Sequence, residues 1–262
     1  WVTEALPIPV TAMLAVGGQA LVGSGTIRAA TNNFISPVFF FVLAMFLFAA
    51  VVRQTKLDIR FARWLLAKSG TDTRRIVLAF MVGTAAMSSI MSDVPACAIW
   101  MALAVGILQR ENLKAGESNF GKVLMLGITI AALIGGIATP AGSSINIMGL
   151  VMLSDLGGGT VPFLKWMAIG VPMVVLLIPI SWLVLIKFFP PEISNISSES
   201  EDKGTSRSPF SSDEFKVIVV FGTVIGLWIL SNWYPQTLDV TMIALIGGVV
   251  LFFPWIGVLR WE

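Results

Sequence analysis

Long apolar stretches separated by short polar segments dominate the chain. The apolar stretches occupy residues 5–23, 34–52, 76–109, 123–153, 164–186, 214–232 and 239–256. An α-helix that crosses a bilayer needs about 20 apolar residues, so most of these stretches match one membrane span. The pattern predicts an all-α polytopic membrane protein. Two stretches, 76–109 and 123–153, are too long for one span and contain residues that interrupt helices.

The composition supports a membrane protein. Hydrophobic residues make up 56% of the chain and charged residues 12%, whereas soluble domains average about 25% charged residues. There is no histidine and one cysteine, Cys97, which excludes histidine-ligated zinc sites, Ser–His dyads and Cys-rich metal sites. An enzyme is therefore not expected, nor is a nucleic-acid partner. The nine tryptophans are expected to face lipid or the membrane interface.

Basic residues concentrate in residues 53–75, which contain seven of the 17 lysines and arginines. The positive-inside rule places this segment and 110–122 in the cytoplasm, with an amphipathic interface helix at 59–66. Both ends of the 76–109 stretch then lie on one side, so this stretch must enter the membrane and return, as a re-entrant helical hairpin or as two tightly packed short helices. Each half, about 17 residues, is short for a full span. The Ser-rich linker 190–213 is also predicted to be cytoplasmic, and the plasma (inner) membrane is the expected location.

A nine-residue match relates the two ends of the chain. Val10–Gly18 (VTAMLAVGG) aligns with Val240–Gly248 (VTMIALIGG), and the topology above sends the two copies in opposite directions. Opposed copies are typical of inverted-repeat transporters. We therefore expect a first repeat at 1–189 and a truncated second repeat at 214–262, with residues missing before Trp1. The first repeat would combine scaffold helices 5–23, 34–52 and 164–186 with transport elements 76–109 and 123–153.

The first interruption is SSIMSDVP at residues 88–95, which contains Asp93, the sole full charge between Arg75 and Arg110. A carboxylate at membrane depth costs about 2.5–3.5 kcal/mol, so it usually has a function. Pro95 fits the first turn of a new helix, which predicts a break near Asp93. Free carbonyls, hydroxyls and a carboxylate suit Na⁺, while free N–H groups suit an anion. A purely structural, helix-capping Asp93 is the alternative.

The second interruption is GGIATPAGSSIN at residues 135–146. Its glycines permit unwound backbone, and Pro140 ends the first half-helix. Polar groups come from Thr139, Ser143, Ser144 and Asn146. Two broken segments in long apolar stretches point to a binding site near the membrane midplane. The alternatives are hydroxyls that bond back to helix carbonyls and glycines that serve helix packing.

Four segments resemble motifs of the divalent anion/sodium symporter family, which carries dicarboxylates, citrate or sulfate. WVTEALPIPVT at the start is similar to the family's WITEAIPLPVT. SSIMSDVPACA at 88–98 is similar to SMWMSNTATTA, and IGGIATPAGSSIN at 134–146 to IGGxGTPIGTPPN. Residues 247–262 resemble LLFLPGVLTWE, which begins the family's second repeat. The resemblance covers the chain in order and implies the N-terminal half of such a transporter.

The resemblance implies an elevator-type secondary transporter, homodimeric when complete, with Na⁺ as the coupling ion and no other cofactor. It implies that the hairpin tip and the first broken helix hold one Na⁺ jointly. The implied cation-binding residues are Ser88, Ser92, Asp93 and Gly142, supported by Thr139. The implied substrate-binding residues are Asp93, Val94, Ser143 and Asn146, which would contact a small anion.

The hairpin tip departs from the family at two adjacent positions, because Asp93 and Val94 stand where the family has Asn and Thr. An ionised Asp93 about 4 Å from a substrate carboxylate would repel it by about 4 kcal/mol at an effective dielectric near 20. It must therefore be neutralised by bound Na⁺ or by a proton, which places it in the coupling-ion site. A cation/proton antiporter, a metalloid-anion permease of the same superfamily and a non-transporting membrane fragment are the competing interpretations.

Overall fold

The computed structural model describes residues 8–22, 26, 28, 37–114, 116–159, 161–196, 210–234, 237–254 and 257–259. Their regular structure is helical: α1 (Ile8–Leu21), α3 (Pro37–Thr55), α4 (Leu57–Ser69), α5 (Thr73–Met91), α6 (Asp93–Arg110), α7 (Asn119–Gly136), η1 (Pro140–Gly142), α8 (Ser144–Asp155), α9 (Phe163–Phe188), α10 (Ser212–Leu230) and α11 (Val240–Val250). Within the described residues, α3, α5, α6, α7 and α9 are long and apolar enough to cross a membrane. The predicted all-α polytopic membrane protein is confirmed.

The helix boundaries follow the apolar pattern closely, and the largest difference lies at the C-terminal end. The helix expected over 239–256 ends at Val250, and beyond it the backbone N–H groups of Val258 and Leu259 both return to the Leu251 carbonyl. The expected first helix is described as α1, with 14 residues. Both copies of the nine-residue match are helical, in α1 and α11. The following parts of expected elements lie outside the described residues: 5–7, 23, 34–36, 197–209 and 255–256.

The 76–109 stretch is a hairpin of two antiparallel helices, α5 and α6, that meet at Ser92. The ring of Trp100 packs against Gly83 and its indole N–H lies 3.0 Å from the Met87 sulfur, so residues at similar distances from Ser92 touch. With 19 and 18 residues at 1.5 Å per residue, each arm is about 28 Å long. The arms are thus longer than the short half-spans that the sequence suggested.

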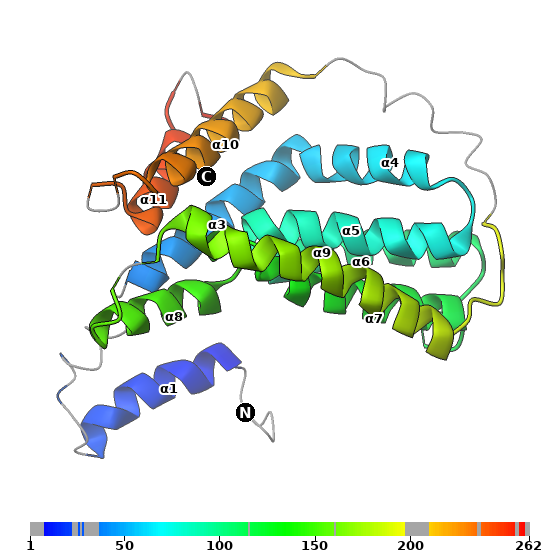
Figure 1. The fold of residues 1–262 in the computed structure, drawn as a ribbon, viewed down its shortest axis with the longest axis horizontal. Coiled ribbons are helices and arrows are strands. Elements are labelled where there is room, and N and C mark those ends of the chain that lie inside the picture. Colours follow the sequence, from blue (N-terminus) through cyan, green and yellow to red (C-terminus); the bar gives the residue numbers. More distant parts are fainter. Residues whose placement is uncertain are drawn as a thin grey trace.

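Helices α5, α6, α7 and α9 lie side by side (Figure 1). Helices α5 and α7 approach closely, since a Cβ on Gly135 would meet three backbone atoms of Ala85 within 2.8 Å. Helix α9 also packs on this group: its Gly170 lies against the carbonyls of Ile137 and Ala138. These four helices therefore form one body, which we call the hairpin body.

Helices α3, α10 and α11 form a second group beside the hairpin body (Figure 1). Gly247 of α11 lets the helix approach Phe48 of α3 and Val224 of α10. The rings of Phe48 and Phe221 lie 4.9 Å apart between their centroids. Since α10 and α11 come from the C-terminal part of the chain, α3 is held by residues distant from it in sequence.

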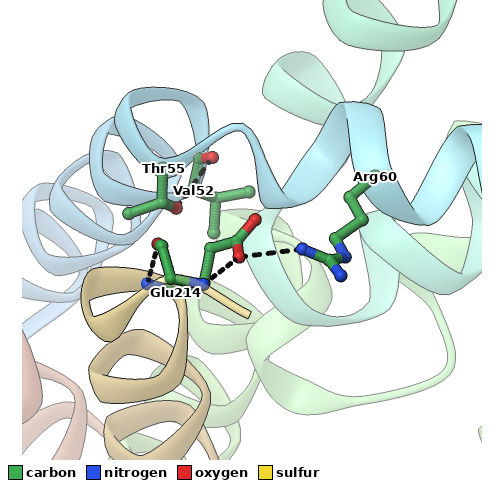
Figure 2. A network of polar contacts seen from close by, with 5 residues as sticks. Val52, Thr55, Arg60 and Glu214 are labelled. Carbon is green, nitrogen blue, oxygen red and sulfur yellow. Dashed lines mark hydrogen bonds and ion pairs between the residues drawn. The ribbon is translucent and has the colours of Figure 1, made fainter. Parts of the chain in front are cut away.

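Helix α4 connects the two groups. It leaves α3 at Lys56, whose backbone is left-handed with φ 58°, and runs along α5 (Figure 1). Its apolar residues pack on the hairpin, with Leu65 against Gly83. On its other side, Arg60 donates to the Glu214 carboxylate of α10 at 2.9 Å (Figure 2). The amphipathic helix expected at 59–66 is therefore anchored on both sides.

The first part of the expected linker is packed rather than extended into solvent. Thr73 N–H donates to the Ser194 carbonyl, and Ile196 N–H to the Thr71 carbonyl. The carboxylate of Glu192 accepts the N–H groups of Asn119 and Phe120 at the start of α7. Residues 190–196 thus hold together the beginnings of α5 and α7.

One end of the hairpin body is rich in positive charge. The starts of α5 and α7 and the ends of α6 and α9 meet there (Figure 1). The basic residues at or near these helix ends are Lys68, Arg74, Arg75, Arg110, Lys114, Lys122 and Lys187. Such a charge distribution is what the positive-inside rule expects of a cytoplasmic face.

Candidate ion- and substrate-binding site

The hairpin tip is a strained turn. Ser92 ends α5 and begins α6 with φ 78° and ψ 154°, a conformation that costs a residue with a side chain about 1–3 kcal/mol. Its hydroxyl donates to Asp93 Oδ1 at 3.0 Å, and the same oxygen accepts the Val94 N–H at 3.0 Å. The carboxylate therefore lies at the start of α6, where the helix dipole favours a negative charge.

The second break covers residues 137–143, between α7 and α8. Unwinding removes the helical partners of several carbonyls, and unpaired carbonyls are costly in an apolar environment. The side-chain amide of Asn146 donates to the carbonyls of Gly136 at 2.7 Å and Thr139 at 3.0 Å. The indole N–H of Trp166 donates to the Ile137 carbonyl at 2.9 Å. Side chains from α8 and α9 therefore stabilise the unwound backbone.

The two breaks lie against each other. The hydroxyl of Thr139 donates to the Ser89 carbonyl at 2.5 Å, and the hydroxyl of Ser88 donates to the Ala132 carbonyl at 2.6 Å. A Cβ built on Gly136 would lie 3.3 Å from the Gly142 carbonyl oxygen and 3.5 Å from the Ser88 hydroxyl oxygen. An oxygen of the second break and the hydroxyl oxygen of Ser88, in the last turn of α5, thus meet around a glycine that has no side chain to separate them.

A pocket of about 150 Å³ opens beside the hairpin tip. One wall is apolar and belongs to α3, and the other contains the tip and one residue of α8. The lining residues are Phe41, Val42, Met45, Phe46, Met91, Ser92, Asp93, Val94, Pro95 and Ser144. An apolar enclosure with few polar groups is the usual form of a small-molecule site.

The predicted site residues fall into three sets in the structure. Ser92, Asp93 and Val94 line the pocket, and Val94 is 71% exposed. Ser88, Gly142 and Ser143 surround Gly136. Thr139 and Asn146 use their side-chain donors on backbone carbonyls.

Charged ligands are scarce here. Among the described residues, no three His, Cys, Asp or Glu side chains come together in a group that could hold a metal ion. A cation at this position would therefore be held by hydroxyl and carbonyl oxygens and at most one carboxylate. Such hard oxygen donors fit an alkali ion better than a transition metal.

Two parts of the site could not be read from the sequence. The apolar wall from α3 has an ordinary membrane-helix composition. Trp166 was expected to face lipid or the interface, like the other tryptophans, but it donates to the second break. A weak signal was present, because Trp166 and Gly170 are one helical turn apart and thus share a face of α9.

Helices able to span a membrane, two neighbouring helix breaks and a pocket beside the hairpin tip define a multi-pass membrane protein with a candidate small-molecule site. The chain belongs to the citrate transporter family, whose sequence profile matches residues 1–262. It is 27% identical over 267 residues to the sodium-dependent dicarboxylate transporter SdcS of Staphylococcus aureus strain NCTC 8325 / PS 47. The proteins of that name from strains COL and N315 match equally.

The alignment covers 96% of this chain and 51% of the relative, so the chain spans about half the length of the curated relatives it matches. These relatives are transporters and not enzymes. The resemblance to the divalent anion/sodium symporters is therefore confirmed at the level of the family.

Proposed function

We propose that this chain forms part of a secondary active transporter for citrate-like or dicarboxylate anions, coupled to Na⁺ or to protons. The observation that carries the proposal is that the second break lies against the end of α5 beside the hairpin tip, through Thr139 to Ser89, and that Ser88 of α5 also bonds Ala132 of α7. Interrupted membrane helices persist where they are packed in protein or line a wet cavity. Paired breaks of this kind are used by transporters for ions and substrates.

The oxygens around Gly136 and the pocket beside Asp93 are suited to different parts of this task. The hydroxyl of Ser88 and the carbonyl of Gly142 offer hard oxygens to the coupling ion, with Ser92 and Asp93 as further ligands and Thr139 as support. The pocket would take one end of the anion beside Val94, Ser143 and Asn146. Bound Na⁺ or a proton on Asp93 would remove the repulsion between its carboxylate and the anion.

The contacts favour an elevator mechanism, in which one group of helices moves against another, and they support an assignment of helices to each group. Helices α3, α10 and α11 pack on one another, which suits a fixed scaffold and, in a homodimer, the interface. The hairpin body, with η1, would move. The sequence assigned 164–186 to the scaffold, but α9 packs on α5 and α7, so we include α9 in the moving body. We place the protein in the plasma membrane with the basic helix ends in the cytoplasm.

Uptake by the complete protein in proteoliposomes tests the proposal. We expect citrate or succinate to accumulate under an inward Na⁺ or proton gradient and not without one. Absence of gradient-driven uptake of any di- or tricarboxylate, with the protein folded, would show that the proposed function is wrong.

The Asp93→Asn variant tests the role of the carboxylate. We expect it to raise the Na⁺ concentration at half-maximal uptake by about tenfold, equal to about 1.4 kcal/mol, or to abolish the pH dependence of uptake. Asp155→Asn is the matched control, since Asp155 is an exposed residue at the end of α8. An unchanged Na⁺ and pH dependence in Asp93→Asn would leave Asp93 as a helix cap.

A further inference from the structure

We propose that Trp166 and Gly170 of α9 are positioning residues that hold the second helix break in its ion-binding shape. This inference rests on the proposed function for its consequence in transport, but its structural part can be measured separately. Neither residue is among the predicted site residues, and neither lines the pocket beside Asp93. They act on the peptide groups that follow Gly136.

The geometry is a close contact between one face of α9 and two successive carbonyls. Trp166 donates its indole N–H to the Ile137 carbonyl oxygen at 2.9 Å. One turn later, a Cβ on Gly170 would lie 2.5 Å from the same oxygen and 3.0 Å from the Ala138 oxygen. Glycine is thus required at this position for α9 to approach the break, and the approach brings the indole within hydrogen-bonding distance.

The contact determines the orientation of the peptide at which helix α7 stops. Ile137 and Ala138 still donate their N–H groups to Ile134 and Gly135, so the chain leaves the helix through these two residues. A few residues later the chain returns, and Gly142 packs against Gly136: a Cβ on Gly142 would lie 2.5 Å from the Gly136 carbonyl oxygen. Loss of the indole donor would leave the Ile137 carbonyl unpaired and allow this segment to rotate.

Another tryptophan on the same helix provides a matched control. Trp182 also donates its indole N–H to a backbone carbonyl, that of Arg74, at 3.0 Å. Arg74 lies at the start of α5, distant in the hairpin from its tip at Ser92. Trp166→Phe and Trp182→Phe therefore remove the same chemical group from the same helix, and they differ in which segment loses its donor.

The first measurement is hydrogen–deuterium exchange of the complete protein in detergent, read by mass spectrometry. We expect Trp166→Phe to speed exchange in peptides covering 137–143 by about fivefold, which corresponds to about 1 kcal/mol, the net worth of one hydrogen bond. Trp182→Phe should leave these peptides unchanged and affect those covering 71–76. Equal exchange over 137–143 in Trp166→Phe and the wild type would overturn the proposal, whatever the transport activity.

The second measurement is Na⁺-dependent uptake in proteoliposomes. Trp166→Phe should raise the Na⁺ concentration at half-maximal uptake by about fivefold with a smaller change in the maximal rate, and Trp182→Phe should leave it within about twofold. Faster exchange with an unchanged Na⁺ dependence would overturn the link to ion binding. Wild-type protein that shows no gradient-driven uptake would contradict the proposed function, while the exchange result would still decide the positioning role.

A second pair of variants guards against failure of Trp166→Phe to fold. Gly170→Ala should loosen 137–143 by steric contact while keeping the indole, and Gly222→Ala in α10, which has open space around it, is its control. Both substitutions place alanine in a helix, so their effects on helix propensity cancel. If exchange over 137–143 is as slow in Gly170→Ala as in Gly222→Ala, the proposed role of the close approach of α9 to the second break is wrong.

Discussion

The contact between Gly135 of α7 and Ala85 of α5 is the tightest of the described glycine contacts with backbone in the hairpin body, and it makes a prediction that needs no assumption about transport. Three backbone atoms of Ala85 lie within 2.8 Å of the position that a Cβ on Gly135 would occupy, whereas ordinary contacts begin near 3.4 Å. Because these atoms belong to a helix backbone, no side-chain rotation can relieve the overlap. We therefore expect Gly135→Ala to push α5 and α7 apart by about 1 Å.

This displacement would act directly on the junction of the two breaks. The hydrogen bonds from Ser88 to Ala132 at 2.6 Å and from Thr139 to Ser89 at 2.5 Å join α5 to the α7 break, and both would lengthen beyond hydrogen-bonding range. Overpacking costs about 1–3 kcal/mol, and each lost hydrogen bond about 0.5–1.5 kcal/mol. The expected loss of stability is therefore about 2–6 kcal/mol.

Thermal unfolding of the purified protein in detergent, followed by tryptophan fluorescence, measures this loss. Gly106→Ala in α6 is the matched control, since no atom lies within 4 Å of its Cβ position. Alanine favours a helix by about 1 kcal/mol over glycine, so Gly106→Ala should keep or raise the Tm while Gly135→Ala lowers it by several degrees. Equal Tm values for the two variants would refute the close packing of α5 on α7.

Two further predictions concern the connections of the hairpin body. Removing one partner of the Arg60–Glu214 pair should cost about 2 kcal/mol of stability, because the two side chains are only 20% and 11% exposed. Removing the exposed Lys114–Glu117 pair should cost under about 0.5 kcal/mol. A double-mutant cycle on Tm with Arg60→Gln and Glu214→Gln measures the difference, and additive effects would contradict a direct interaction. Burial raises the pKa of Glu192, but the N–H groups of Phe120 and Asn119 and the charge of Lys122 outweigh it, so its pKa lies below the usual 4.5. The carboxylate should therefore stabilise the protein relative to Glu192→Gln above about pH 4.5, by about 0.5–1 kcal/mol, and this advantage should vanish as the pH falls through the lowered pKa. A Tm difference that is independent of pH would contradict this role.

The positions of both breaks could be predicted from the sequence because their causes are local. Pro95 fits the start of a helix, and a polar run precedes it, so the break at Ser92 follows from neighbouring residues. Pro140 and the glycines around it act in the same way on the second break. The lengths of the hairpin arms were underestimated, because Thr73–Arg75 and Arg110 extend the helices beyond the uncharged stretch.

The partners of the polar groups could not be predicted, because they are distant in sequence. Ser88 lies 44 residues from Ala132, and Trp166 lies 29 residues from Ile137. Residues 190–196 have the composition of a linker, yet Glu192 binds the start of α7. Such pairings depend on helix packing, which one sequence does not specify without the fold.

In the proposed site, the hydrogen bonds at the second break would order the segment before an ion arrives. A carbonyl oxygen has two lone pairs, so the donors from Asn146 and Trp166 each leave one lone pair of Gly136 and Ile137 for another partner. An ion that binds to such oxygens need not first break a hydrogen bond, and the segment it meets has already lost its conformational entropy. The same donors keep the unwound backbone from exposing unpaired carbonyls to an apolar environment when the ion is absent. Under the proposed function, stability without the ion and affinity for it would depend on the same side chains, which is why Trp166→Phe is expected to change both the exchange rate of the break and the Na⁺ dependence of uptake.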